Sequence, residues 1–299
     1  MRGVQTLGVE LGDKLRRGRG KNPTGFFEDR DLLRIYQRLK RILGIRGQSV
    51  ALIDAECWQT PQVQALKDEA IATIRRRFGE YPLWGYKHGR TLRLLPFWES
   101  VYQALELDVS YVVALRNPLS VTHSRGRLDP RRGVPEKGDL EWLVNVVPYF
   151  RQMSERPFVV VDFDLMMSDP ASQLDRIART IDLPVEPESR EKVEAYRSKF
   201  LRPRMRHSRF SIEDLRADAR VNHLVRDAYA WLHKLATDSI QTDDADFWHD
   251  WQRIEAAVQD LAPVLRHVDR IESELWRAQL HPAGPLQAIP RLWRKLRYG

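Results

Sequence analysis

The sequence is poor in cysteine and contains no long apolar run, and each absence excludes a class of protein. Cys57 is the one cysteine in 299 residues, which excludes an intrachain disulfide and a zinc site built from several cysteines. No run of about eighteen or more apolar residues occurs, and the first residues lack a signal-peptide core. The histidines are scattered without the spacing of metal ligands. We therefore expect a cytoplasmic protein that neither spans a membrane nor holds a metal.

What the sequence does contain is a substantial apolar fraction and an excess of positive charge. Apolar residues make up 42% of the chain, enough to bury the core of one large domain, with or without an appendage. The formal net charge of +8 indicates anionic partners, a class that includes nucleotides, acidic glycans, anionic lipids and nucleic acids. No nucleic-acid-binding motif accompanies the charge, so no nucleic-acid partner is expected.

Strand and helix patterns alternate along the first two thirds of the chain. Two β-branched apolar runs, Tyr111–Leu115 and Phe158–Val161, predict buried strands. Weaker patterns predict short strands at Ser49–Asp54 and Leu83–Lys87. Helices are predicted at Asp29–Leu43, at Gln62–Phe78, at Thr91–Leu107, around Trp142 with a kink at Pro148, and from Asp169 onward. Such alternation predicts a parallel sheet with right-handed crossovers.

The C-terminal part is purely helical in its pattern. We place a boundary after residue 238, which separates an α/β domain of residues 1–238 from a helical extension of residues 239–299. Apolar residues of the extension follow the heptad alternation of a coiled-coil seam, at Phe247, Trp251, Ile254, Val258, Leu261, Leu265, Val268 and Leu275. This seam predicts self-association through the helix. Pro263 interrupts it and Glu272 occupies one of its positions, so a helix packed on its own domain is the equal alternative.

The last ten residues carry apolar side chains among basic ones. Residues 290–299 resemble a short interfacial helix that would contact anionic lipid. The alternative is a frayed, solvated tail. We therefore expect at most a peripheral contact with a membrane.

The segment after the strand Tyr111–Leu115 carries the most specific signal. Arg116, Asn117 and Pro118 follow the strand directly, and Ser124 lies eight residues after the arginine. Proline favours the first turn of a helix, so Arg116 leaves the carboxyl end of a strand, where open α/β sheets bind ligands. Ser124 would lie roughly 12 Å further along that helix. The pair can hold one phosphate if the helix folds back beside the strand end; the alternative is a salt-bridging arginine and a surface serine.

These residues resemble the bacterial sulfotransferase-like family, whose members carry a strand, then Arg-Asn-Pro or Arg-His-Pro, then a serine eight positions after the arginine. Asn22–Asp29 resembles the family's Asn-Pro-x-Gly-Phe-Trp-Glu segment, and Trp84–Thr91 resembles its Lys-Asp-Pro-Arg segment. Leu201–His207 is similar to its late basic segment. The resemblance covers about residues 1–238 and rests on the order of the segments.

The resemblance implies a three-layer α/β/α sandwich around a central parallel sheet, of the kind found in P-loop NTPases. It implies transfer of a sulfuryl group from 3′-phosphoadenosine 5′-phosphosulfate to a hydroxyl of a carbohydrate or lipid-linked glycan. Arg116 and Ser124 would bind the 3′-phosphate of this co-substrate, and Arg206 and His207 would close over its phosphates. No metal takes part in this chemistry.

Lys87, His88 and Arg90 are the candidate catalytic residues. Sulfuryl transfer resembles phosphoryl transfer, because negative charge spreads over the transferring oxygens and is stabilised by positioned cations. Lys87 and Arg90 follow a predicted strand and would supply such cations. His88 stands where the family has an aspartate and would take the acceptor proton, with a structural histidine as the alternative. Gly89 replaces the family's proline and loosens the turn.

Four carboxylates beside predicted strand ends and helix starts are weaker candidates. Glu28 and Asp29 precede one helix, and Asp162 and Asp164 follow the strand Phe158–Val161. Acidic residues at helix starts usually cap the helix and interact with its dipole, and strand-end aspartates often cap turns. We therefore favour capping over chemistry for these residues.

The family's second donor site is a glycine- and serine-rich loop after the first strand, and this chain has no such loop. The chain opens on residues that look like the end of the helix that follows it, so we expect either a start internal to a longer reading frame or a member that lost the loop. Residues 18–21 do not replace it, since they lack a preceding strand and the Gly-Lys-Ser/Thr order. The alternative function is therefore a catalytically inactive protein that binds a nucleotide, a glycan or a partner.

Overall fold

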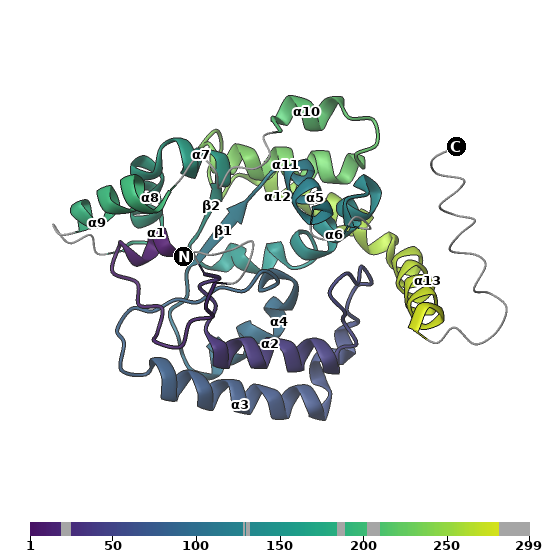
Figure 1. Ribbon diagram of the computed structural model, residues 1–299, viewed down its shortest axis with the longest axis horizontal. Coiled ribbons are helices and arrows are strands. Elements are labelled where there is room, and N and C mark those ends of the chain that lie inside the picture. Colours follow the sequence, from purple (N-terminus) through teal and green to yellow (C-terminus); the bar gives the residue numbers. More distant parts are fainter. Residues whose placement is uncertain (19–24, 128, 130–131, 184–188, 202–209, 281–299) are drawn as a thin grey trace.

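The computed structural model describes residues 1–18, 25–127, 129, 132–183, 189–201 and 210–280, and within these it is mostly helical around a small parallel sheet (Figure 1). Strand β1 (Tyr111–Leu115) pairs with β2 (Phe158–Asp162) in parallel, from Tyr111 opposite Phe158 to Leu115 opposite Asp162. Both strands and their parallel pairing confirm the sequence prediction. The chain is thus a helix-rich protein whose sheet, over the described residues, has two strands.

The described helices surround this sheet. Their bounds are α1 Arg2–Gln5, α2 Arg30–Ile42, α3 Pro61–Phe78, α4 Leu95–Ala104, α5 Pro118–Gly126, α6 Pro135–Val146, α7 Phe163–Ser168, α8 Pro170–Thr180, α9 Ser189–Ala195, α10 Ile212–Ala217, α11 His223–Ala236, α12 Ala245–Asp260 and α13 Ala262–Leu280. Helices α2, α3 and α4 form one group below the sheet, and α13 projects on the opposite side from α8 and α9 (Figure 1).

Local capping explains where several helices start. Asp29 accepts hydrogen bonds from the backbone amides of Asp31 and Leu32, at 2.9 and 3.0 Å, and thereby starts α2. Ser211 and Asp214 form a reciprocal capping box at the start of α10. Helix α6 ends at Val146, so the predicted kink at Pro148 is wrong. A proline two residues past the last helical residue cannot continue the helix, and here the helix stops before it.

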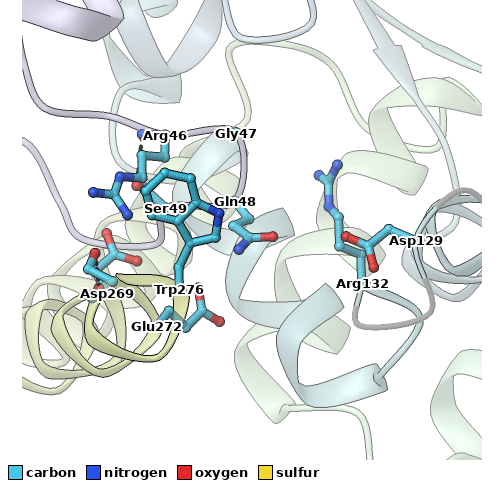
Figure 2. A pocket seen from close by; sticks show the side chains of 10 residues that line it. Arg46, Gly47, Gln48, Ser49, Asp129, Arg132, Asp269, Glu272 and Trp276 are labelled. Atoms are coloured by element: carbon cyan, nitrogen blue, oxygen red, sulfur yellow. Dashed lines mark hydrogen bonds between the residues drawn. The ribbon is translucent and has the colours of Figure 1, made fainter. Parts of the chain in front are cut away.

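The predicted strands at Ser49–Asp54 and Leu83–Lys87 do not form. At the first segment, Asp269 on α13 accepts hydrogen bonds from the backbone amides of Val50 and Ala51, at 2.7 and 3.0 Å, and lies beside this loop in Figure 2. The guanidinium of Arg93 donates hydrogen bonds to the backbone carbonyls of Ser49 and Ala51, at 2.6 Å each. Because side chains satisfy its polar backbone groups, this segment needs no neighbouring strand.

At the second segment the chain makes only a single parallel bridge, between Glu10 and Trp84. The amide of Gly85 donates to the carbonyl of Glu10 at 2.8 Å, and the amide of Glu10 donates to the carbonyl of Leu83 at 3.1 Å. These bonds join the N-terminal residues to the turn that precedes Lys87. Pairing stops there, and the chain continues into a turn rather than into a strand.

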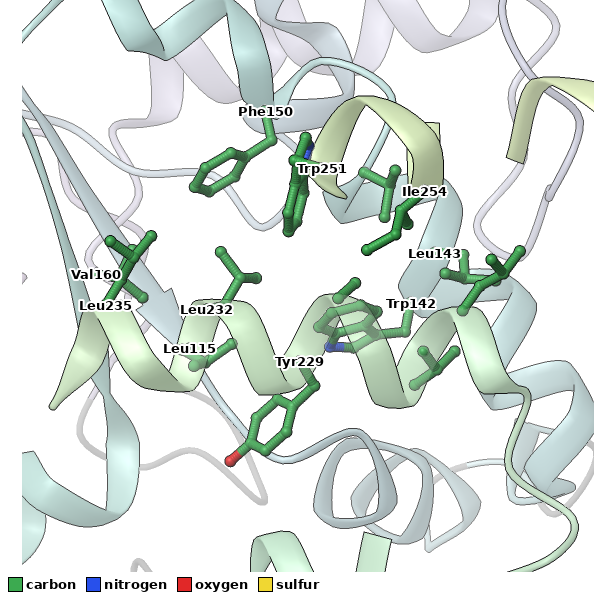
Figure 3. Packing of buried hydrophobic residues seen from close by; sticks show 14 of the residues in the cluster. Leu115, Trp142, Leu143, Phe150, Val160, Tyr229, Leu232, Leu235, Trp251 and Ile254 are labelled. Atoms are coloured by element: carbon green, nitrogen blue, oxygen red, sulfur yellow. The ribbon is translucent and has the colours of Figure 1, made fainter. Parts of the chain in front are cut away.

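Strand β2 is buried on both faces, because its side chains alternate between two cores. Phe158 and Val160 belong to the largest core, which α6, α11 and α12 complete. Figure 3 shows Val160 and Leu115 facing side chains of α11 and α12 in this core. Val159 and Val161 face the opposite way, into a smaller core with α8. Strand β1 is less covered, since Val112 is 39% exposed.

The predicted heptad seam of the C-terminal helices divides between two environments. Phe247, Trp251, Ile254 and Val258 of α12 are buried in the largest core, together with residues of the sheet. Of the two alternatives that the sequence leaves open, α12 thus follows the second, a helix packed on its own chain rather than a coiled-coil seam. On α13, Leu265 lies in a small cluster with Val50 and Val144. Leu275 is 57% exposed. The boundary after residue 238 and self-association stay predictions, while the packing gives α12 and the sheet one common core.

The basic segment 290–299 lies outside the described residues, so its contact with lipid stays a prediction. Over the part of the chain that is described, no helix has both the length and the apolar composition needed to cross a bilayer.

Candidate functional site

Arg116 leaves the carboxyl end of β1 as the sequence predicts, and its guanidinium is only partly satisfied. The group lies over the ring of Phe163, 4.7 Å from its centroid. Its Nε and Nη2 atoms are buried and have no hydrogen-bond partner among the described residues. Burial lowers the pKa of Arg116, and the charges of Asp164 and Asp162 partly offset this effect. Buried unpaired donors are costly, so an anion that accepts from them is stabilised here.

Ser124 lies on helix α5, which begins two residues after Arg116. Asn117 caps the helix by accepting from the amide of Leu119 at 2.9 Å. The helix lies so close to α6 that a Cβ atom at Gly138 would meet the Thr122 hydroxyl oxygen at 2.0 Å, which only glycine avoids. Arg116 and Ser124, both described, share no hydrogen bond. A ligand is needed to connect them, and their joint role stays a prediction.

The next residue, Arg125, belongs to a second group of charges. Glu141 is 1% exposed and pairs with Arg125 at 2.9 Å and with Arg132 at 2.6 Å. The same three residues affect Arg90. Burial lowers the pKa of Arg90, and the positive charges of Arg125 and Arg132 lower it further, whereas the negative charge of Glu141 raises it. The end of α5 therefore faces the turn that contains Lys87, His88 and Arg90.

That turn is anchored through the imidazole of His88. The ring stacks on Tyr36 with 4.0 Å between centroids, and the hydroxyl of Tyr36 is hydrogen-bonded to that of Thr91 at 2.7 Å. The backbone amide of Arg90 donates to His88 Nδ1 at 3.3 Å. The Arg90 guanidinium donates to the carbonyls of Arg46, at 3.1 Å, and Gly47. These contacts hold two of the predicted site residues, His88 and Arg90, against α2 and the loop that follows it.

Cations surround His88. Burial, followed by the charges of Lys40, Arg90, Lys87 and Arg16, lowers the pKa of His88 to about 3. Glu28 is the carboxylate among them: it lies 3.2 Å from Arg16 and 3.6 Å from Lys87. We refer to Arg16, Glu28, Lys40, Lys87, His88 and Arg90 as the His88 cluster. Four cations against one carboxylate make this cluster attractive to an anion.

Sequence reasoning treats Glu28 and Asp29 alike, and the structure separates them. Asp29 caps α2, whereas Glu28 pairs with the cations of the His88 cluster. Lys40 and Arg125 are functional candidates that sequence reasoning missed. Lys40 is one of several basic residues on α2, and no local signal distinguishes it from the others.

A pH titration of stability tests the environment of His88. In the unfolded chain the imidazole binds a proton near its ordinary pKa of 6.5, whereas in the folded chain it does so only near 3. The unfolded state therefore binds more protons between these values, so stability falls as the pH is lowered from about 6.5 towards about 3. We expect His88→Gln to lose less stability than the native chain over this window, measured by urea midpoints. Parallel curves for the two proteins would contradict this assignment.

Two sets of predicted site residues lie outside the described part of the chain. These are Arg206 and His207, predicted to cover the donor phosphates, and residues 22–24 of the Asn22–Asp29 segment. Within the described residues, no group of three or more histidine, cysteine, aspartate or glutamate side chains is arranged to hold a metal ion.

The geometry thus contains a partly unpaired arginine at a strand end and a cationic cluster around a neutral histidine. The first is suited to a phosphate and the second to a further anionic group. No protein-family model, no curated protein and no solved structure matches the chain.

Proposed function

We propose that this protein is a sulfotransferase-like protein that binds 3′-phosphoadenosine 5′-phosphosulfate and transfers its sulfuryl group to a hydroxyl of a carbohydrate or glycoconjugate. The observation that carries the proposal is Arg116 at the carboxyl end of β1, whose Nε and Nη2 atoms are buried and have no partner in the part of the chain that the structure describes. A planar guanidinium with free donors matches the oxygens of a phosphate group. Ser124 and, by resemblance, Arg206 and His207 would complete the contacts to the donor.

The His88 cluster would serve the transfer itself. In this step the bond between the sulfur and the donor's bridging oxygen breaks, and the acceptor oxygen bonds to sulfur. Lys87 and Arg90 would stabilise the charge on the sulfuryl and bridging oxygens. His88 would take the acceptor proton. An anion bound beside Lys40 and Lys87 would offset the charges that lower the pKa of His88, and would make it a stronger base.

The three-layer α/β/α sandwich is part of the same proposal. Helices α8 and α11 lie on opposite faces of β2, which is the layering such a fold requires. Val112 of β1 is exposed, and in such a fold a further strand or helix would pack against this part of β1.

A comparison of two nucleotides tests donor binding. 3′-Phosphoadenosine 5′-phosphate and adenosine 5′-phosphate differ only in the 3′-phosphate. Because charge-assisted hydrogen bonds contribute about 1.5–3 kcal/mol, we expect the first to bind about 10- to 100-fold more tightly, as measured by calorimetry. Equal affinities would remove the 3′-phosphate site from the proposal.

The second candidate is a catalytically inactive protein that binds the nucleotide, a glycan or a partner. The observation that favours it is the pKa of about 3 for His88 in the free protein, because a base so weak removes a hydroxyl proton poorly. Incubation with sulfur-labelled donor and a panel of soluble glycans separates the two candidates. Labelled glycan supports transfer, whereas tight nucleotide binding without labelled product supports the inactive protein.

A further inference from the structure

A cleft of about 320 Å³ opens between α13, the loop after α2 and the residues before α6. Its volume is at the lower end of the range of roughly 300–1,000 Å³ that is usual for small-ligand sites. It is separate from Arg116 but adjoins the His88 cluster, since Arg90 donates to the carbonyls of Arg46 and Gly47 in the wall of the cleft.

An exposed tryptophan forms one wall of the cleft. Trp276 is 47% exposed and is the most exposed of the described tryptophans. The guanidinium of Arg46 lies 5.0 Å from the centre of its ring, which holds the indole in place by a cation–π contact. Figure 2 shows Trp276 beside Arg46 and Gln48, with Arg132 across the gap. A flat apolar ring left in water at the mouth of a cleft is suited to stacking against a ligand.

The polar groups of the cleft favour a neutral ligand over an anionic one. The lining contains two arginines, Arg46 and Arg132, and three carboxylates, Asp129, Asp269 and Glu272, and Lys137 pairs with Glu272 at 2.7 Å. The positive and negative charges of the cleft therefore balance, although the whole chain has a net charge of +8, and a balanced site has no surplus of cations to attract a polyanion. Gln48 offers both an acceptor and two donors, and it points into the gap between Trp276 and Arg132 (Figure 2).

We propose that this cleft binds a neutral pyranose ring of a glycan, stacked on Trp276 and hydrogen-bonded by Gln48 and the surrounding charged groups. The apolar face of a sugar ring matches the indole, and its hydroxyl groups match amide and carboxylate side chains that both donate and accept. Its position next to Arg90 makes it the acceptor site, and this role, unlike the sugar binding itself, rests on the proposed sulfuryl transfer.

Affinity gel electrophoresis in gels that contain dextran, mannan or galactan tests the proposal. We expect at least one of these neutral polymers to retard the native chain. Trp276→Ala is expected to weaken that binding about tenfold, as for a central aromatic contact, and Trp276→Phe to restore part of it. Trp231→Ala is the matched control, because Trp231 also lies beneath a cation, with Lys234 Nζ 3.8 Å from its centroid, but in a different groove.

The proposal is overturned if none of the three polymers retards the protein, if Trp276→Ala binds as well as the native chain, or if Trp231→Ala loses binding equally. Nucleotide binding separates this result from the proposed transfer. Sugar binding that survives in a protein with no affinity for 3′-phosphoadenosine 5′-phosphate keeps the cleft and removes the donor site. If no variant binds sugar, but the native chain and Trp276→Ala bind the nucleotide equally well, the donor site is kept and the sugar site in the cleft is removed.

Discussion

Arg116→Ala is expected to weaken the binding of 3′-phosphoadenosine 5′-phosphate about 10- to 100-fold and to leave the binding of adenosine 5′-phosphate nearly unchanged. The guanidinium has two buried donor atoms without a partner among the described residues, so its removal deletes the charge-assisted hydrogen bonds that these atoms would donate to the 3′-phosphate. Calorimetry with both nucleotides on both proteins gives a cycle that isolates the contribution of Arg116 to 3′-phosphate recognition.

Two further variants sharpen this test. Arg253→Ala removes an equal charge from an exposed position of α12, where the side chain is 75% exposed and pairs with Asp250. It should bind the nucleotide like the native chain. Arg116→Lys keeps the charge and loses the planar fork, so an intermediate affinity is expected. If Arg116→Ala and Arg253→Ala lose affinity equally, overall charge rather than a site at β1 explains the binding.

Trp251→Ala is expected to lower the free energy of unfolding of the whole chain by about 3–5 kcal/mol. Trp251 on α12 is fully buried, and its ring centroid lies 4.6 Å from that of Phe150. Phe150 in turn packs on Phe158 of β2 at 5.6 Å. The substitution therefore leaves a cavity between the C-terminal helix and the sheet, in a core that relaxes only in part.

Urea unfolding followed by circular dichroism measures this effect. Trp276→Ala is the control, because an exposed tryptophan on the neighbouring helix α13 contributes little to stability, within about 0.5 kcal/mol. One cooperative transition, shifted as a whole in Trp251→Ala, is expected from a shared core. A main transition that keeps its midpoint, with a separate early loss of helix, would instead mean that residues 239–299 fold independently of residues 1–238.

Features that depend on a few neighbouring residues were predictable from the sequence. The cap at Asp29 and the two strands were found because caps and apolar periodicity are read over short windows. Lys87, His88 and Arg90 were named from the resemblance of Trp84–Thr91 to a family segment, because all three lie within four consecutive positions. The chemistry of these residues could not be predicted from the sequence, because the pKa of His88 depends on Lys40 and Arg16, which come from other parts of the chain.

Features decided by distant partners were predicted wrongly or left open. Ser49–Asp54 has the composition of a strand, yet its backbone binds Asp269, which lies 219 positions from Val50. The heptad pattern of α12 is compatible with a second copy or with the chain's own core, and it is the aromatic cluster around Phe150 that buries it. Glu28 and Asp29 are neighbours, but only one of them lies beside Arg16 and Lys87.

The sequence by itself determined the starts of α2 and α8, the two parallel strands and the position of Arg116 at the end of β1, because short-range hydrogen bonding and side-chain periodicity follow from chain geometry. Only the tertiary structure decided that Arg116 buries two donors without partners among the described residues, that cations gather around His88, and that Trp276 faces a cleft beside Arg90. These properties depend on which groups are brought together and which are left without partners. Packing between segments that are distant in sequence decides both which groups meet and which stay unpaired.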